Sequence, residues 1–210
     1  MGAAATVVFV HGLWMTGLEF FRLRRHVARA GFATHRFGYR SITRPLADNA
    51  SRLAAFVGAL APAPVHLVGH SLGGLVILRM LRDHPQVAVG RVVLLGSPVR
   101  GSVVARRLVA RPWSRWLIGA AADDALAPAA PVDWQPRAPI GVVVGTREVG
   151  VGRVLGGVPS PSDGTVAVAE TELPGAADTV HVPATHTTLP MSAEVARQVL
   201  AFLGAGRFAR

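Results

Sequence analysis

The sequence places one serine between two glycines at a point where a strand is expected to turn into a helix. Gly69-His70-Ser71-Leu72-Gly73 has the pattern G-x-S-x-G and follows residues 65–68, a mainly hydrophobic segment expected to be a strand. Such a turn strains the backbone at the serine, and its glycines keep side chains from colliding with neighbouring elements. The Ser71 hydroxyl would then project from the carboxyl edge of a sheet and could attack an acyl carbonyl. In the alternative interpretation, Ser71 merely caps the following helix.

A second motif, His11-Gly12-Leu13-Trp14, follows the first expected strand. Together with Gly-His-Ser-Leu-Gly-Gly it resembles the α/β-hydrolase fold, in its small lipase and esterase branch. The order of elements resembles that family over essentially the whole chain. The resemblance implies that the backbone amides of Leu13 and Leu72 form an oxyanion hole, which stabilises negative charge on a carbonyl oxygen during acyl transfer. The alternative for His11-Gly12 is an ordinary turn at the end of a strand.

A serine nucleophile needs a base to remove its proton, and in this fold the acid and the histidine follow the serine in that order. Of the eight histidines, only His181 and His186 lie downstream of every plausible acid. His181 lies in an alternating segment typical of a strand, which favours a structural role. His186 lies in a loop before the last expected helix and could reach Ser71, so it is the predicted base. We expect His70 to pack near the site rather than to catalyse.

Two carboxylates are candidates for the acid. Glu148 follows the expected strand 140–144 almost directly, which is the usual location in the larger family. Asp163 lies in Pro-Ser-Asp-Gly-Thr-Val and resembles the Asp-Gly-x-Val signature of a lipase subgroup, whose histidine follows some two dozen residues later, as His186 does. An Asp also suits a tight Asp-Gly turn, where local amides can hold its carboxylate. We therefore predict Asp163, with Glu148 as the alternative and a simple turn-forming Asp163 as a third interpretation.

We predict no cofactor and no metal. Lipases of that subgroup often carry a calcium site with an aspartate soon after the histidine, whereas Thr187 and Thr188 occupy those positions here. We find no carboxylate cluster elsewhere in the sequence. The chain has no cysteine, which excludes disulfides, thiolate metal sites and a cysteine nucleophile.

Length and composition predict one domain over residues 1–210, because half of the 210 residues are hydrophobic and only 16% are charged. No apolar stretch approaches the roughly 20 residues of a membrane span. The start has no basic leader, so we expect a cytoplasmic protein. The net charge of +10 comes from arginines scattered along the chain. We interpret them as a solvated surface and expect no nucleic acid partner.

The catalytic candidates need a sheet to position them. Strands alternate with helices of 10 to 15 residues, which predicts an α/β fold with a mostly parallel central sheet and helices on both faces. We expect the last helix to begin at Ser192 and to end at Gly204. Strands are expected at residues 6–10, 32–37, 65–68, 91–95 and 140–144, with further ones around 165–169 and 179–182, and helices at residues 18–30, 45–60 and 72–81.

The alternation breaks between residues 97 and 138, where this fold inserts caps over its active site. We expect a short cap or lid there, with Trp113 and Trp116, beside Leu117 and Ile118, as an apolar wall for an acyl chain. Trp14 is a further candidate for substrate contact. The alternative is that these side chains pack the segment onto the body of the protein.

These observations predict a serine hydrolase that cleaves carboxylic esters through an acyl-enzyme intermediate, with a small-molecule substrate and lipids among the candidates. Several alternatives stay open at this point. The chain could be a catalytically silent α/β-hydrolase scaffold used for binding, or an acyltransferase, peptidase or thioesterase with the same triad. It could also be a basic protein that binds polyanions through its arginines. The sequence does not predict the oligomeric state.

Overall fold

The computed structural model describes residues 5–60, 62, 64–110, 119–121, 128–129, 134–150, 152 and 157–210. Its centre is a sheet in which every neighbouring pair of strands is parallel, in the order β2-β1-β3-β4-β5-β6. This confirms the predicted α/β fold with a parallel sheet. The strands are β1 (Thr6–Val10), β2 (Ala33–Phe37), β3 (Val65–His70), β4 (Val92–Leu95), β5 (Ile140–Gly145) and β6 (Asp178–Val182).

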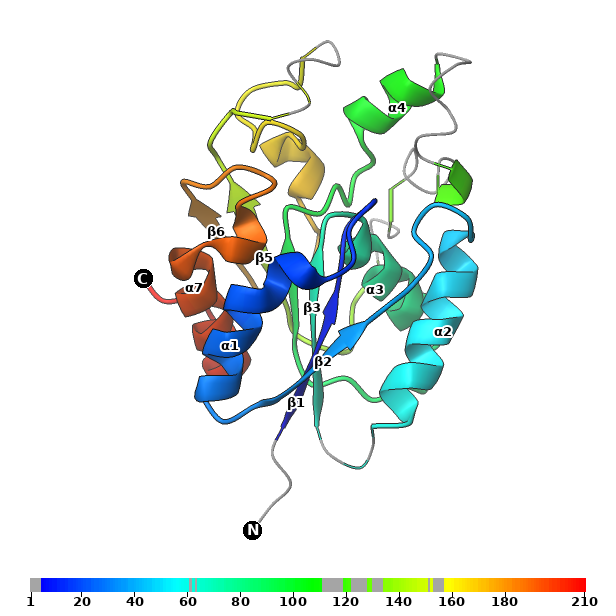
Figure 1. The fold of residues 1–210 in the computed structure, drawn as a ribbon, viewed down its shortest axis with the longest axis vertical. Helices are drawn as coiled ribbons and strands as arrows, with labels where there is room; N and C mark the ends of the chain where they lie inside the picture. Colours follow the sequence, from blue (N-terminus) through cyan, green and yellow to red (C-terminus); the bar gives the residue numbers. More distant parts are fainter. Residues whose placement is uncertain are drawn as a thin grey trace.

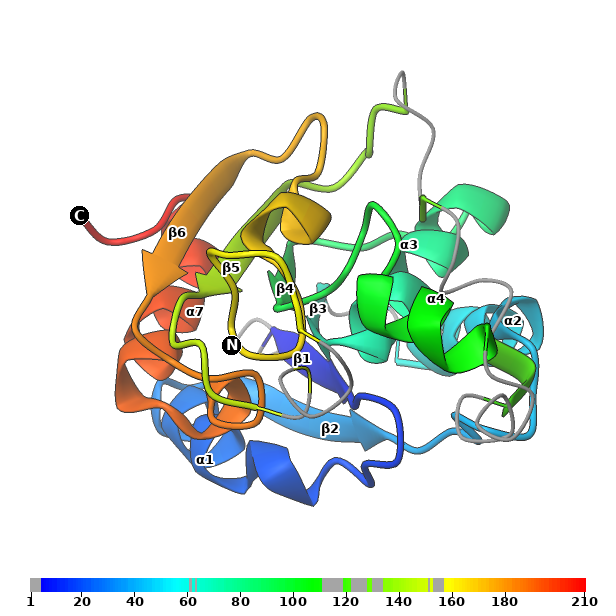
Figure 2. The same ribbon diagram turned by 90° about the horizontal axis from the view of Figure 1, so that it is seen from above.

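Helices cover both faces of the sheet, as predicted (Figures 1 and 2). On one face α1 (Phe21–Arg29) packs against α7 (Ala193–Ala205), and on the other α2 (Leu46–Gly58) packs against α3 (Leu72–Asp83). A short helix, α4 (Val103–Val109), lies beyond the ends towards which the strands point (Figure 1).

The central strands are buried at every position, and most of these positions are apolar, because each strand buries both of its faces. In β1, Val8 and Val10 belong to the core under α2 and α3, whereas Val7 and Phe9 belong to the core under α1 and α7. Successive side chains of a strand point to opposite faces. A parallel sheet between two helical layers therefore needs continuous apolar runs rather than alternation.

Two sequence predictions on element boundaries were wrong. The expected strand at residues 165–169 is a loop with a single bridge from Ser162 to Ala167, followed by the 3-10 helix η3 (Val168–Thr171). The Asp163 carboxylate accepts hydrogen bonds from the backbone N–H groups of Thr165 and Val166, which are donors that a strand would use in its ladder. The segment therefore forms a turn around this side chain.

The second correction concerns the last helix. The hydroxyl of Ser192 accepts a hydrogen bond from the Val195 amide and caps α7, as predicted. The helix continues past Gly204 to Ala205. It ends at Gly206, which has a φ of 73° and donates its N–H to the carbonyl of Phe202. The left-handed conformation at Gly206, which glycine adopts at little steric cost, ends the helix.

The expected insertion at residues 97–138 falls partly outside the described residues. Trp113 and Trp116 lie outside them, as do Leu117 and Ile118, so the predicted apolar wall of these side chains stays a prediction. The described part of the insertion includes α4. Within the described ranges, no helix has the length and apolar character needed to cross a membrane.

Glu170 joins α4 to the loop that carries Asp163. Its buried carboxylate accepts hydrogen bonds from the backbone amides of Val103, at 2.5 Å, and Ala167, at 2.9 Å. Val103 is the first residue of α4, whose N-terminal amides have no acceptor within the helix. One side chain thus fixes two segments that are distant in sequence.

We expect Glu170→Ala to lower the free energy of unfolding by about 2 kcal/mol or more, because two N–H donors lose their acceptor. Urea denaturation of both proteins measures this difference. Glu172→Ala is the matched control, since that neighbouring carboxylate is exposed and forms a surface ion pair with Arg100. The control is expected to change stability by less than about 1 kcal/mol. Equal effects of the two substitutions would contradict the role of Glu170.

Candidate active site

Ser71 lies in the turn between β3 and α3 in a backbone conformation that side-chain-bearing residues rarely adopt. Its φ is 53° and its ψ is −123°. The Ser71 hydroxyl makes no capping hydrogen bond to α3, so the interpretation of Ser71 as a helix cap is wrong. The Ser71 amide donates to the carbonyl of Leu95, at 2.9 Å, which ties the turn to β4. The hydroxyl is thus held at the carboxyl end of the sheet without a structural bond to the helix that follows.

The glycines around Ser71 allow α3 to approach the neighbouring strands closely. A Cβ on Gly73 would lie 2.1 Å from the carbonyl oxygen of Val10, the last residue of β1. A Cβ on Gly69 would lie 2.8 Å from the Cα of Gly74. Because real Cβ atoms do not come so close to backbone atoms, both positions of the G-x-S-x-G pattern require glycine here.

The structure brings His186 and Asp163 together. The Nδ1 atom of His186 lies 2.7 Å from Oδ2 of Asp163, and these residues are only 8% and 1% exposed. The backbone amide of His186 also donates to the carbonyl of Asp163, at 2.9 Å. If Nδ1 donates to the carboxylate, the neutral ring leaves Nε2 as an acceptor for a proton. This is the arrangement that a general base requires.

Local amides hold the Asp163 carboxylate, as the Asp-Gly turn predicts. Oδ1 accepts from the amides of Thr165, at 3.0 Å, and Val166, at 2.7 Å. Gly164 has a φ of 88°, which completes the tight turn. Oδ2 is therefore left for His186.

The alternative acid, Glu148, lies exposed in the loop after β5, and the described residues give it no hydrogen bond or ion pair. Asp163 nevertheless lies over the end of β5, where the larger family carries its acid. A Cβ on Gly145, the last residue of that strand, would lie 2.7 Å from the Asp163 Cβ. Of the two candidates, only Asp163 contacts His186 in the described structure.

The candidates for the oxyanion hole lie beside the serine. A Cβ on Gly12 would lie 3.2 Å from the Ser71 Cβ, so the loop after β1 packs directly on the turn that carries Ser71. Leu13 and Leu72 line the same cavity as Ser71. The Leu72 amide belongs to the first turn of α3, where an amide has no acceptor within its own helix. An amide without an acceptor inside its own helix can bind a ligand oxygen.

Two aromatic rings hold the loop after β1. The rings of His11 and Tyr39 stack at 4.3 Å, and the Tyr39 hydroxyl donates to the carbonyl of His11 at 2.7 Å. His11 Nδ1 lies 2.8 Å from the carbonyl of Gly12 and must donate, because a carbonyl only accepts. Burial lowers the pKa of His11 and raises that of Tyr39, so both rings are neutral at physiological pH. Together these contacts fix the backbone next to Leu13.

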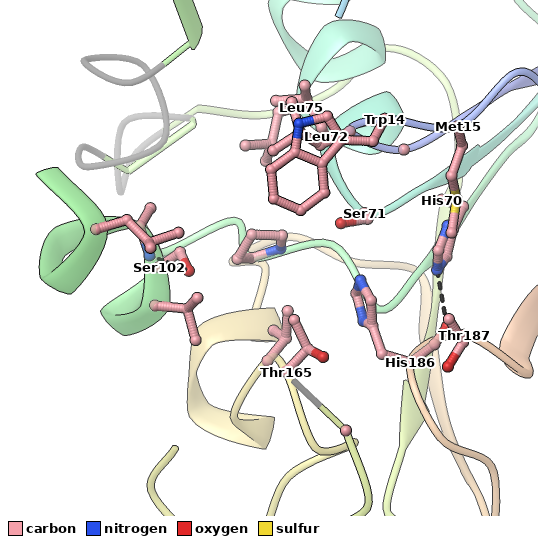
Figure 3. A pocket seen from close by; sticks show the side chains of 18 residues that line it. Trp14, Met15, His70, Ser71, Leu72, Leu75, Ser102, Thr165, His186 and Thr187 are labelled. Atoms are coloured by element: carbon pink, nitrogen blue, oxygen red, sulfur yellow. Dashed lines mark hydrogen bonds between the residues drawn. The ribbon is translucent and has the colours of Figure 1, made fainter. Parts of the chain in front are cut away.

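A cavity of about 240 Å³ opens onto Ser71 and His186. Figure 3 shows the Ser71 hydroxyl and the His186 ring facing the same space. Trp14, a candidate for substrate contact, is 54% exposed and lines this cavity. No Asp, Glu or Arg is among its described lining residues. The apolar walls come from α3 and α4, through Leu72, Leu75, Val104, Ala105 and Leu108.

Sequence reasoning missed the α4 wall. Val104, Ala105 and Leu108 follow helical spacing, so the apolar face of α4 was readable from the sequence. The sequence did not predict which part of the molecule this apolar face contacts, because the segment lies outside the regular alternation of strands and helices. Met15, Thr165 and Thr187 were also missed as lining residues, and no pattern in the sequence marks them.

No group of three or more His, Asp or Glu side chains within the described part of the chain is arranged to hold a metal ion. The two threonines after His186 differ in their surroundings. Thr187 lines the cavity, whereas Thr188 exchanges hydrogen bonds with Thr185 in the same loop. The cavity therefore offers hydroxyl groups and histidines as its polar side chains.

His70 introduces a pH dependence of stability. Burial, and then the nearby His186, hold the pKa of His70 well below its ordinary value of 6.5. In the unfolded chain His70 regains that ordinary pKa, so the unfolded state binds more protons as the pH falls below it. The stability associated with His70 is complete above about pH 6.5 and is lost progressively below it, by about 1.4 kcal/mol per pH unit.

Urea denaturation at several pH values between about 7.5 and 5 tests this expectation. We expect the free energy of unfolding to fall below pH 6.5, and His70→Gln to remove the share that His70 contributes to the slope. Burial also lowers the pKa of His11 and His66, so part of the slope is expected to remain. An unchanged slope in the variant would show that His70 does not titrate differently in the folded protein.

Comparison with known proteins gives the family. Residues 7–206 match the sequence profile of the Alpha/beta hydrolase family. The chain belongs to this family. The match covers nearly the whole α/β hydrolase chain and confirms the resemblance that the two glycine motifs indicate. None of the curated proteins compared with the sequence matches it significantly.

Solved structures show the same fold. The mature lipase BlEst2 from Bacillus licheniformis is 20% identical to this α/β hydrolase, with a TM-score of 0.75 over 97% of this chain and 92% of its own. A hydrolase from Pseudomonas aeruginosa is 20% identical, with a TM-score of 0.70 over 98% of this chain and 92% of its own. The metagenomic carboxyl esterase MGS0156 is 21% identical, with a TM-score of 0.70 over 89% of this chain and 65% of its own. At this identity the similarity shows the fold alone.

Proposed function

We propose that this α/β hydrolase is a serine esterase that cleaves small carboxylic esters through an acyl-enzyme intermediate. The observation that carries the proposal is the buried 2.7 Å contact between His186 and Asp163, on a cavity that also holds Ser71 in a strained turn. A nucleophile, a base and an acid that orients the base are the side chains that this chemistry needs. The similar structures named lipase and carboxyl esterase support it.

In the proposed mechanism, Ser71 Oγ attacks the ester carbonyl carbon while Nε2 of His186 takes the hydroxyl proton. The amides of Leu13 and Leu72 donate to the oxyanion of the tetrahedral intermediate. His186 then returns the proton to the leaving alcohol, and the carbon–oxygen bond to that alcohol breaks. A water molecule, deprotonated by His186, attacks the acyl-enzyme in the same way and releases the carboxylic acid.

The cavity favours a small substrate without charge. Its described lining has no Asp, Glu or Arg, and burying an unpaired charged group there would be costly. Its volume of about 240 Å³ lies below the roughly 300–1,000 Å³ of pockets for drug-sized ligands. We therefore propose an apolar acyl group of modest length, placed between Trp14 and the wall of α4. A cytoplasmic location, without nucleic acid as a partner, stays a prediction from composition.

A fluorophosphonate probe and a series of p-nitrophenyl esters test this function. We expect the probe to label Ser71, and hydrolysis to be faster for short acyl chains than for long ones. Labelling without hydrolysis of any ester would instead indicate acyl transfer to another acceptor. The absence of both labelling and hydrolysis would overturn the proposal and would favour the catalytically silent scaffold.

A further inference from the structure

His70 connects the nucleophile to the base. It is the last residue of β3 and the covalent neighbour of Ser71, and its side chain is fully buried. Its Nε2 atom lies 3.0 Å from the backbone carbonyl oxygen of His186, a residue 116 positions later in the chain. Because a carbonyl oxygen only accepts, Nε2 of His70 must carry the hydrogen. Figure 3 marks this bond with a dashed line that starts at the ring of His70.

Among the described residues, three hydrogen bonds fix His186 in its loop. Two come from Asp163, which accepts from the backbone amide of His186 at 2.9 Å and pairs with its ring at 2.7 Å. The third comes from His70 and acts on the carbonyl. Of these three bonds, only the third originates on β3, the strand directly before Ser71. It therefore sets the position of the base relative to the nucleophile, whereas the other two set it relative to the acid.

The packing around His70 leaves its ring little freedom. The centroid of the His70 ring lies 4.8 Å from that of the His186 ring and 6.4 Å from that of the Phe20 ring, which is nearly perpendicular to it. Its Nδ1 atom is buried without a hydrogen-bond partner among the described residues, and a Cβ on Gly12 would lie 3.2 Å from it. The ring thus fills the space between the loop after β1 and the loop of His186.

The surroundings also keep His70 uncharged. Burial lowers the pKa of His70 most, and the titratable rings of His186, on the loop before α7, and of His11, after β1, lower it further. The hydrogen bond to the carbonyl of His186 acts in the opposite direction. A proton on Nδ1 would be buried without an acceptor. A neutral ring with its hydrogen on Nε2 can donate to the carbonyl and adds no positive charge beside His186 when that ring becomes protonated in the reaction.

We propose that His70 is a positioning residue, which holds His186 at the distance from Ser71 that proton transfer requires, through the carbonyl of His186. The inference rests on the proposed function. Proton transfer needs heavy atoms within hydrogen-bond reach. A displacement of about 1 Å by a change outside the reacting atoms can cost about 10²-fold in rate.

Two substitutions distinguish the effect of the Nε2–H donor of His70 from the effect of its side-chain volume. His70→Leu fills the space without a donor, whereas His70→Gln places an amide N–H near the position of Nε2. With p-nitrophenyl butyrate, we expect His70→Leu to lower kcat by about 10²-fold while KM changes by about twofold or less, because acyl binding does not use His70. We expect His70→Gln to recover at least about tenfold of the lost kcat.

His66→Leu is the matched control. His66 is a buried histidine of the same strand, and its Nδ1 accepts from the Arg91 amide at the opposite end of β3 from Ser71. We expect this control to lower stability but to leave kcat within about twofold of the parent protein. Thermal unfolding of all three variants shows how much of each effect comes from loss of fold.

The outcomes distinguish this inference from the proposed function. A folded His70→Leu protein with unchanged kcat would overturn the role of His70, while loss of activity in Ser71→Ala would still support the esterase. Failure of His70→Gln to recover activity would also overturn it. If His70→Leu does not fold, ring ¹⁵N spectra of the parent protein test the inference by showing which nitrogen of His70 carries the hydrogen. The Nε2–H form of His70 should persist between about pH 5 and 8, and an Nδ1–H form would contradict the inference.

Discussion

Replacing Ser71 with alanine is expected to lower kcat for p-nitrophenyl esters by about 10⁶-fold, the scale of loss when a serine nucleophile is removed from a triad. Stability should change by less than about 1 kcal/mol, because the hydroxyl makes no capping bond to α3. Ester hydrolysis and urea denaturation of the same preparation measure both quantities. The same variant should no longer react with a fluorophosphonate probe.

Ser97→Ala is the matched control for this experiment. Ser97 is a buried serine after β4, its hydroxyl has no hydrogen-bond partner among the described residues, and it is not a described lining residue of the cavity. We expect this control to keep its activity. Hydrolysis by Ser71→Ala at the parent rate would rule out Ser71 as the nucleophile, whatever the control shows.

The second large effect is expected at the acid. Asp163→Asn should lower kcat by about 10⁴-fold, because an amide at the position of Oδ2 donates to Nδ1 of His186 and stabilises the wrong tautomer. With the hydrogen on Nε2, the imidazole cannot take the proton of Ser71. The amide oxygen of the new side chain can still accept from Thr165 and Val166, so the turn is expected to persist.

Glu148→Gln provides the comparison for the acid. Glu148 is exposed and has no described contact, and we expect its replacement to leave kcat within about twofold. Steady-state kinetics of Asp163→Asn and Glu148→Gln at a pH near 7.5 measure the two values of kcat. The opposite pattern, with a large loss in Glu148→Gln and none in Asp163→Asn, would assign the acid to Glu148.

The substitutions of Ser71 and Asp163 test the proposed nucleophile and the proposed acid of the mechanism. Loss at Ser71 alone would indicate a nucleophile activated by another acid, whereas losses at both residues would support the complete set. The inference about His70 concerns the link between them. Its expected effect is smaller because His70 acts through the backbone of His186 and does not touch the reacting atoms.

The sequence by itself determined most of the elements and the tight turn at Ser71, because these depend on neighbours along the chain. Continuous apolar runs predict strands buried on both faces, and the glycines around Ser71 predict a turn too tight for side chains. The cap of α7 by Ser192 is likewise a contact over three residues. The order of candidate acid and histidine after the serine was also readable.

Only the tertiary structure decided which groups meet. Asp163 rather than Glu148 contacts His186, since the turn that carries Asp163 packs over Gly145 at the end of β5. The same carboxylate binds the amides that an expected strand at residues 165–169 would have used. The bond from His70 to His186 spans 116 residues. Contacts at such separation depend on how the sheet and its loops pack, and local periodicity carries no information about them.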